Sequence, residues 1–316
     1  MGRVGRLERE DKPMKNLWIC AALALVAVPM AAQEISTEGP APTTALISAR
    51  SKNNAPLDAG QLKLQVNGHD APISSVTPVV PARAEIAILI DDGLRGSFGL
   101  QIKDLQNFID QLPAGTPVFV GYMDEGGVRA AQPFTTDHMA AINALRVPMS
   151  AAGISASPYL CLSEFVKHWP SNHRAPRFVL MMTNGVDPYN GSVSVMNQDS
   201  PYVQTAQEDA ERAGVAVYSI FYRDSGMRRG TFSGQSYLQQ VADATGAQVL
   251  SGEMTPVSLA PYLKDFSKYV AESYTVNFLA STTRERGSTL VPIKVKTSQP
   301  GMKIYAPENV HPGTVE

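Results

Sequence analysis

Between residues 84 and 271, short apolar runs alternate with segments of helical periodicity, and this alternation constrains the fold more than any other feature. The apolar runs occupy residues 85–90, 118–122, 178–182 and 215–220. Continuous apolar runs suit strands that are covered on both faces, as in parallel sheets. Strands that alternate with helices build such sheets. The sequence therefore predicts an α/β domain over 84–271, with a Rossmann-like, mostly parallel sheet and helices on both faces.

Two β-like segments flank this domain. In residues 45–81, Leu62, Leu64 and Val66 alternate with polar residues, and residues 67–68 (Asn-Gly) favour a hairpin turn. Apolar and polar residues alternate again at the start of residues 272–306. Neither segment is long enough to enclose a core of its own. We therefore expect the two to pack together as one small antiparallel β module.

The remaining segments lie at the ends of the chain. Residues 33–44 are polar and rich in proline, which predicts a flexible lead-in, and residues 307–316 are predicted to be a loose tail. Residues 1–32 are predicted to be a secretory signal peptide, because Lys15 is followed by the apolar run 17–28 and then by small residues. The run is shorter than the roughly 20 residues that span a bilayer. We expect translation to start at Met14 rather than Met1.

This segment predicts a secreted protein, or one of the periplasm or cell envelope, with no membrane span left after cleavage. Cys20 lies inside the apolar run rather than at its end, which disfavours a lipid anchor. Cleavage would leave Cys161 alone, and a lone thiol cannot form an internal disulfide.

Composition and motifs exclude several classes of protein. Lys and Arg number 27 against 29 Asp and Glu, so the chain is not a generally basic nucleic-acid binder. The sequence has two cysteines, no His-Glu-x-x-His and no Cys-x-x-Cys, which excludes a disulfide scaffold and the common zinc sites. A nucleophile elbow, a Walker loop and a dinucleotide-binding glycine motif are also missing. These features predict a non-enzymatic protein.

Candidate binding residues follow the predicted strands. In parallel sheets, ligands bind beyond the carboxyl ends of the central strands. Three loops should meet there: one after the strand at 85–90, one before a helix that starts at Tyr159, and one after the strand at 178–182. Their candidate residues are Asp91, Asp92, Arg95, Ser97, Ser155, Ser157, Asn184 and Asp187.

The chain resembles a von Willebrand factor A (vWA) domain, and most of all the secreted bacterial "VWFA-related" family of acidobacterial type. The matching stretches are AEIAILIDD (84–92), RFVLMMTNG (177–185) and AERAGVAVYS (210–219), together with the flanking β segments. The resemblance implies a domain that binds other proteins. It also implies a site in which an Asp-x-Ser-x-Ser motif, a Thr and an Asp hold Mg²⁺ or Mn²⁺, whose open position takes a carboxylate from the partner.

This chain departs from the family's metal site. Gly93 and Arg95 replace the two serines, the second loop has no Thr, and Asn184 stands where an Asp is expected. Arg95 also places positive charge beside the cation. The resemblance therefore implies a degenerate site that holds no metal. If Mg²⁺ does bind, its candidate ligands are Asp91, Ser97, Ser155 and Asp187. The alternative for Asp91 and Asp92 is that they cap the next helix and order the loop.

The leading hypothesis is a secreted, non-enzymatic module that binds an unidentified protein at these loops, with Arg95 pairing to a partner carboxylate. Two alternatives stay open. One is a hydrolase at the loop end of the sheet, with Asp91 and Asp92 as acid and base. The other is a structural component of the envelope, assembled through the β segments, whose edge strands can add a partner strand.

Overall fold

A computed structural model describes residues 39–53, 55–150, 157–187, 200–223, 231–252, 256–281 and 289–314. The predicted signal peptide, residues 1–32, lies outside the described residues. Among the described residues, none of the helices has the length and apolar character needed to span a bilayer.

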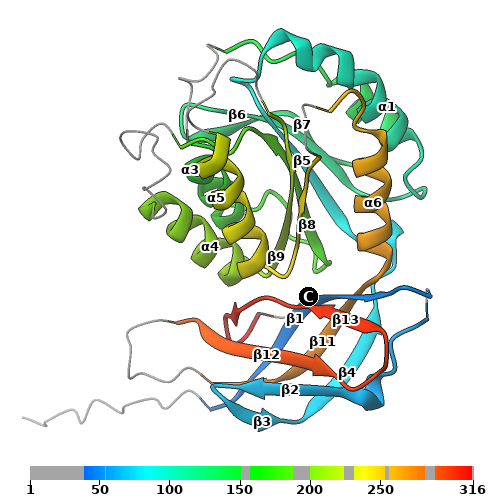
Figure 1. Ribbon diagram of the computed structural model, residues 1–316, viewed down its shortest axis with the longest axis vertical. Helices are drawn as coiled ribbons and strands as arrows, with labels where there is room; N and C mark the ends of the chain where they lie inside the picture. The colour runs from blue at the N-terminus through cyan, green and yellow to red at the C-terminus, as the bar shows by residue number, and fades with distance from the viewer. Residues whose placement is uncertain are drawn as a thin grey trace, which may run out of the picture. The chain divides into compact units, whose positions relative to one another are not determined.

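A six-stranded sheet forms the centre of the α/β domain, in the order β10-β9-β8-β5-β6-β7 (Figure 1). Its strands are β5 (Glu85–Asp91), β6 (Val118–Asp124), β7 (Gly127–Thr135), β8 (Arg177–Thr183), β9 (Val215–Phe221) and β10 (Val249–Leu250). Neighbouring strands are parallel, except that β7 runs antiparallel to β6 at one edge. The strand order changes direction between β5 and β8, so their carboxyl ends flank the switch point of a doubly wound sheet. The predicted fold class is confirmed.

Helices cover both faces of this sheet. The α-helices are α1 (Ile102–Asp110), α2 (His138–Asn143), α3 (Pro158–Lys167), α4 (Pro201–Ala213), α5 (Thr231–Ala244) and α6 (Ala260–Ala271), and 3₁₀ turns are η1 (Ala59–Gln61), η2 (Pro81–Arg83) and η3 (Gly96–Gln101). Local signals fix several ends: Ser157 and Ser200 accept hydrogen bonds at the starts of α3 and α4, each followed by proline. Gly214 ends α4 with a φ of 68°.

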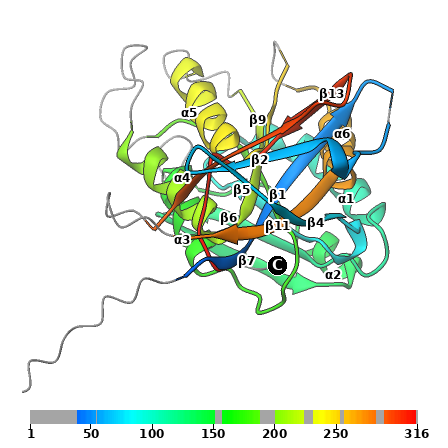
Figure 2. The same ribbon diagram turned by 90° about the horizontal axis from the view of Figure 1, so that it is seen from below.

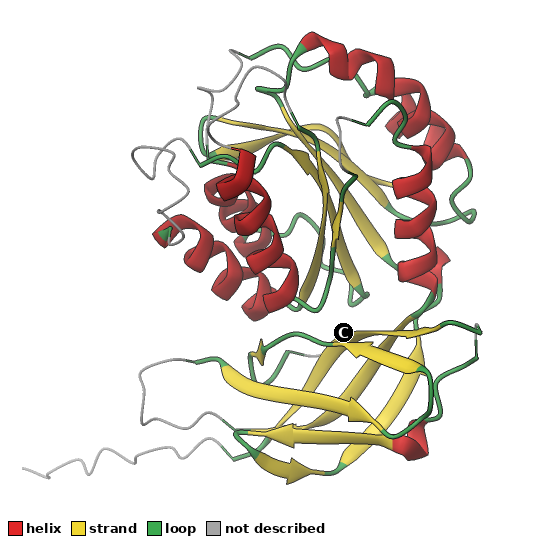
Figure 3. Ribbon diagram, viewed as in Figure 1, coloured by secondary structure: helices red, strands yellow, loops and turns green. Residues whose placement is uncertain are grey.

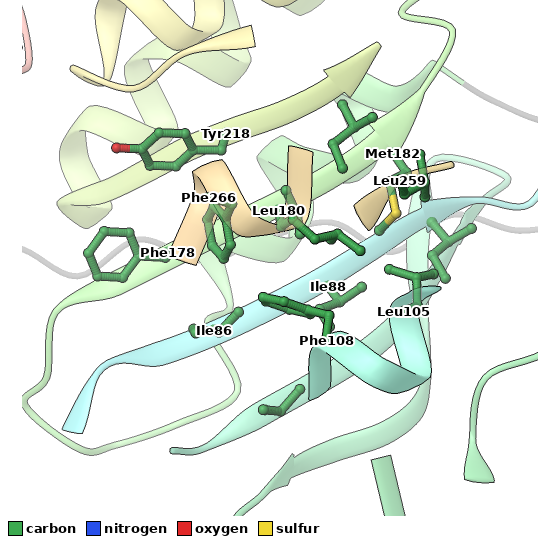
Figure 4. Close-up of a cluster of buried hydrophobic side chains, with 14 of the residues drawn as sticks. Ile86, Ile88, Leu105, Phe108, Phe178, Leu180, Met182, Tyr218, Leu259 and Phe266 are labelled. Carbon is green, nitrogen blue, oxygen red and sulfur yellow. The ribbon is translucent and has the colours of Figure 1, made fainter. Parts of the chain in front are cut away.

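The apolar side chains of each strand divide between two cores. Ile86, Ile88 and Ile90 of β5 pack with residues of α1 and α6, as the close-up in Figure 4 shows for part of this core. Ala87 and Leu89 point to the opposite face and pack with residues of α3, α4 and α5. Successive strand residues face opposite sides of a sheet, so the uninterrupted apolar run of β5 is what two covered faces require.

The flanking segments form two four-stranded sheets, in the orders β13-β1-β11-β4 and β14-β12-β2-β3. The strands are β1 (Ala41–Ser51), β2 (Leu62–Val66), β3 (His69–Ala71), β4 (Ile73–Pro78), β11 (Ser273–Ala280), β12 (Val291–Thr297), β13 (Met302–Tyr305) and β14 (Asn309–Val310). Strands from the two ends of the sequence pair directly, as in Ala45 opposite Val276 and Leu64 opposite Val295. Figure 2 shows β1, β11 and β4 side by side, and Figure 3 shows that this module consists mainly of strands, with the short helix η1 at its edge.

Two terminal segments are more ordered than the sequence predicted. Strand β1 begins at Ala41, so residues 41–44 are not part of a flexible lead-in: Thr43 and Thr44 are buried and pair with β11. The predicted tail contains β14, and Thr314 accepts a 2.7 Å hydrogen bond through its carbonyl oxygen from the backbone N–H of Thr44. Pairing with distant strands supplies the hydrogen bonds that order both segments.

A buried carboxylate links the α/β domain to the β module. Glu211, in the last turn of α4, accepts hydrogen bonds from the backbone N–H of Asn309 (2.9 Å) and from its side-chain amide (2.9 and 3.1 Å). Burial raises the pKa of Glu211 to about 7, although the hydrogen bonds from Asn309 act in the opposite direction. The joint between the two modules therefore includes a group that titrates near neutral pH.

Candidate functional site

Asp91 is the last residue of β5 and lies at the switch point of the sheet. Its Oδ2 accepts a 2.6 Å hydrogen bond from the hydroxyl of Thr183, the last residue of β8, and its Oδ1 accepts a 2.9 Å hydrogen bond from the N–H of Gly93. Burial raises the pKa of Asp91 to about 6, the two hydrogen bonds lower it, and the charges of Asp92 and Asp124 raise it.

Asp92 is held by a different set of donors. The Arg146 guanidinium donates hydrogen bonds of 2.6 and 3.0 Å to the two carboxylate oxygens, and the Met149 N–H and the Ser150 hydroxyl add two more. Burial acts to raise the pKa of Asp92, but these hydrogen bonds and the charge of Arg146 bring it below its ordinary value. Arg146 also lies over the ring of Tyr122, with its guanidinium carbon 3.7 Å from the ring centre.

Both carboxylates order loops, and neither caps the next helix. The following turn, η3, has Arg95 as its N-terminal flanking residue, without a side-chain cap, and α1 begins after Gln101, also without one. The Asp91 side chain closes a tight turn onto Gly93, and Asp92 fixes residues 146–150. The sequence suggested, as an alternative to metal binding, that Asp91 and Asp92 cap the next helix and order the loop. The contacts agree with loop ordering but not with helix capping.

The other predicted residues separate into buried and exposed groups. Ser157 is buried and caps α3, while Asn184 is buried and accepts a hydrogen bond from the Val186 N–H. Asp187 is buried and accepts a 2.8 Å hydrogen bond from the Ser200 hydroxyl at the start of α4. Arg95 and Ser97 are exposed beside the end of β5. Ser155 lies outside the described residues.

The sequence did not identify several residues at this edge. Thr183 and Arg146 hold the two carboxylates, and the Tyr159 hydroxyl donates a 2.7 Å hydrogen bond to the Gly185 carbonyl. Asp124 is the last residue of β6, as Asp91 is of β5. Its Oδ2 lies 3.0 Å from Nη2 of Arg129. Asp124 and Thr183 both stand at strand ends, and this position was the available signal for them, whereas nothing near Arg146 in the sequence indicates its partner.

This donor set is a poor fit for Mg²⁺. The oxygens of Asp91 and Asp92 already accept hydrogen bonds, and the positively charged Arg146 pairs with Asp92. Within the ranges that the structure describes, no group of three His, Cys, Asp or Glu side chains is arranged to hold a metal ion. A hard divalent cation prefers about six oxygen ligands. The absence of metal remains a prediction, and it now rests on the hydrogen bonds of Asp91 and Asp92 as well as on the sequence.

Exposed apolar side chains lie on the loops next to the two carboxylates. Leu100 is 82% exposed, Met149 76% and Val257 96%. Contacts join their segments: the Met149 N–H binds Asp92, and the Gln101 amide donates a 3.3 Å hydrogen bond to the Val257 carbonyl. Val147, which is 41% exposed, packs against Gly99: a Cβ added at Gly99 would lie 3.1 Å from the Val147 side chain. We call Leu100, Val147, Met149 and Val257 the apolar rim.

Comparisons with known proteins give matches to solved structures only. No protein-family model matches the sequence, and no curated protein matches it either. A von Willebrand factor type A structure from Catenulispora acidiphila is 14% identical, covers 87% of this chain and 74% of its own, and has a TM-score of 0.44. An aerotolerance-related membrane protein from Bacteroides fragilis is 12% identical (59% of this chain, 98% of its own, TM-score 0.43).

The pilus adhesin SpaC from Lactobacillus rhamnosus GG is 10% identical, with 79% of this chain and 47% of its own covered and a TM-score of 0.45. These likenesses concern the fold alone. The narrower "VWFA-related" family stays a prediction. At such TM-scores, the α/β assignment rests on the strand order and register of this chain.

Proposed function

We propose that this protein is a non-enzymatic interaction module that binds a protein partner at the loop end of its six-stranded sheet. The observation that carries this proposal is the apolar rim. Large side chains as exposed as Leu100, Met149 and Val257 are costly to leave in water, and apolar groups gathered on a surface typically mark an interface. Loops on a rigid sheet are also where binding residues concentrate.

Arg95 supplies the charge of the proposed interface. It is exposed on the loop that leads into η3, the turn that also carries Leu100. A guanidinium group recognises a carboxylate through two parallel hydrogen bonds. The partner that fits this surface therefore presents an acidic side chain next to apolar ones. This arrangement replaces the metal-mediated capture of a carboxylate that the vWA resemblance implies.

The environments of Asp91 and Asp92 favour the binding function over the hydrolase alternative. A pKa of about 6 would suit Asp91 as a general acid, but its side chain is only 9% exposed and both of its oxygens accept hydrogen bonds. Asp92 is fixed by Arg146 and ionised at neutral pH. Neither group is placed to take a proton from a substrate, so we retain binding as the proposed function.

The test is quantitative capture of the natural partner from the envelope fraction of the source organism, with and without a chelator. We expect Leu100→Ser combined with Met149→Ser to weaken capture about tenfold or more, and Arg95→Ala to weaken it by about 1–3 kcal/mol. Chelator should have no effect. Leu279→Ser is the matched control, because Leu279 is 51% exposed on β11 of the β module.

The outcomes separate the competing sites. If the combined rim variant and Arg95→Ala both capture the partner as well as the parent protein, the loop end is not the interface. An edge strand of the β module, such as β4, then becomes the better candidate, in line with the envelope-assembly alternative. Loss of capture on adding chelator would instead indicate a metal-dependent site.

A further inference from the structure

A second candidate site lies at the opposite ends of the strands, where β8 begins. The last turn of α3, the first residue of β8 and the last turn of α4 surround an open hollow of about 350 Å³. This volume falls within the range of sites for small molecules. Its lining includes Val166, Lys167, Trp169, Arg177, Arg212 and Ala213. Three cationic side chains thus converge on it from three different elements.

One buried carboxylate in this lining is already satisfied. Asp209 accepts a 2.6 Å hydrogen bond from the Ser163 hydroxyl and a 2.7 Å hydrogen bond from Arg212 Nη1, and Lys167 Nζ lies 3.4 Å from it. Asp209 is buried, and these contacts hold its carboxylate in place in the wall of the hollow. It offsets one of the three positive charges and leaves Arg212 with donors on its other nitrogens.

Arg177 differs from the other two cations. Its side chain is only 25% exposed, and its guanidinium carbon lies 5.4 Å from the centre of the Trp169 ring. Its Nε is 4.0 Å from Glu85, too far for a hydrogen bond, and Glu85 itself accepts from the Trp169 indole N–H at 2.7 Å and from the Ser171 hydroxyl. Among the described residues, the Arg177 guanidinium therefore meets opposite charge without donating a hydrogen bond.

We propose that this hollow binds the carboxylate of a small organic molecule, with Arg177 as the principal donor. Three cations against Asp209 and Glu85 leave about one positive charge, which matches a single carboxylate. The planar guanidinium offers the two parallel donors that a carboxylate accepts. Val166, Trp169 and Ala213 form the apolar part of the wall, against which the organic part of the ligand would lie.

The alternative is purely structural. Lys167 and Arg212 lie in the last turns of α3 and α4, where cations complement the helix dipoles. That role accounts for those two residues. It does not account for Arg177, which stands at the start of a strand. The test therefore substitutes Arg177.

The experiment titrates the full-length chain with benzoate and with its neutral analogue benzamide. Trp18 and Trp169 are the two tryptophans of the chain, so a Trp18→Phe background makes Trp169 the sole tryptophan fluorophore. We expect benzoate to change its emission saturably and benzamide to leave it unchanged. Arg177→Gln should raise the benzoate Kd about tenfold or more, and Arg129→Gln, on exposed β7, should leave it unchanged.

Two further variants decide the question if Arg177→Gln fails to fold. Arg177→Lys keeps the charge but loses the fork, and should raise the Kd less than tenfold. Ala213→Glu adds a negative charge at the lip of the hollow, and should abolish binding. The proposal is overturned if benzamide binds as well as benzoate, if benzoate gives no saturable change, or if the folded Arg177 and Ala213 variants bind like the parent.

Discussion

Thr183 donates a 2.6 Å hydrogen bond to Asp91 and so joins the ends of β5 and β8, the two strands between which the sheet order changes direction. In a doubly wound sheet this is the position where a ligand is expected. Here the Asp91 carboxylate at this position already accepts a hydrogen bond from Thr183 of the same protein. The relationship explains why the proposed interface uses the exposed residues around Asp91 rather than Asp91 itself.

Thr183→Val tests the contribution of this contact to stability. Valine keeps the shape but removes the donor, which leaves a buried carboxylate oxygen without its partner. We expect the free energy of unfolding at pH 7 to fall by about 1–3 kcal/mol, measured by urea denaturation. Thr205→Val, at an exposed position of α4, is the control and should change it by less than about 0.5 kcal/mol. Equal effects of the two changes would contradict this account.

Arg146→Ala should destabilise the loop that Asp92 orders. The change leaves a buried carboxylate without its two-pronged partner. Because Arg146 is itself 36% exposed, we discount the effect of losing a fully buried ion pair and expect a loss of about 2 kcal/mol. Arg129→Ala breaks contacts with Asp124 and Glu125 from an exposed position and should cost under about 1 kcal/mol. A larger loss for Arg129→Ala would show that the Asp92 contact is not the stronger one.

Mg²⁺ should bind weakly or not at all. Asp91 and Asp92 would have to give up Thr183 and Arg146 to coordinate it, and Arg95 adds positive charge nearby. Isothermal calorimetry at pH 7 should therefore show no saturable heat at micromolar Mg²⁺. A micromolar affinity that Asp91→Ala abolishes would mean that the loop rearranges to form a metal site.

Glu211 should make stability depend on pH. Its pKa is about 7 in the folded protein and 4.5 ordinarily, so the folded state binds the proton more tightly. Its contribution is therefore fully present below about pH 4.5 and declines as the pH rises to about 7. Glu211→Gln removes this decline: the variant should match the parent near pH 4 and exceed it by up to about 3 kcal/mol at pH 8. Glu208→Gln, exposed on the same helix, removes one of the charges that raise the pKa of Glu211, so it should make the decline smaller without abolishing it.

Export should remove the N-terminal segment. We expect the mature protein to begin near Gln33 and to carry no lipid, because Cys20 lies within the segment that is cleaved. Intact-mass analysis of the exported protein measures both. A retained N-terminus, or a lipid on Cys20, would disprove the predicted processing.

The predictable part of the fold depends on residues whose pattern is local. The run around Ile88 is apolar at every position, and such a run has one common explanation, a strand covered on both faces. Thr43 and Thr44 gave no such signal. Polar residues are read as loop, but these two are buried because β11, far away in the sequence, supplies their partners.

The candidate site shows the same division. The sequence placed Asp91, Asn184 and Asp187 at one edge of the sheet because they follow strands that it identified. It could not tell whether those oxygens were free to bind a ligand. That depends on donors such as the Thr183 hydroxyl and the Ser200 hydroxyl, and on which of them the folded chain brings within 3 Å.

By itself, then, the sequence determined the α/β class, the covered sheet and the loops at its carboxyl edge, because hydrophobic periodicity and turn residues act over a few positions. Only the tertiary structure decided that Arg146 neutralises Asp92, that Thr183 occupies Asp91 and that Leu100, Met149 and Val257 remain in solvent. Hydrogen bonding and burial are set by neighbours in space, and those neighbours lie tens of residues or more apart in the chain.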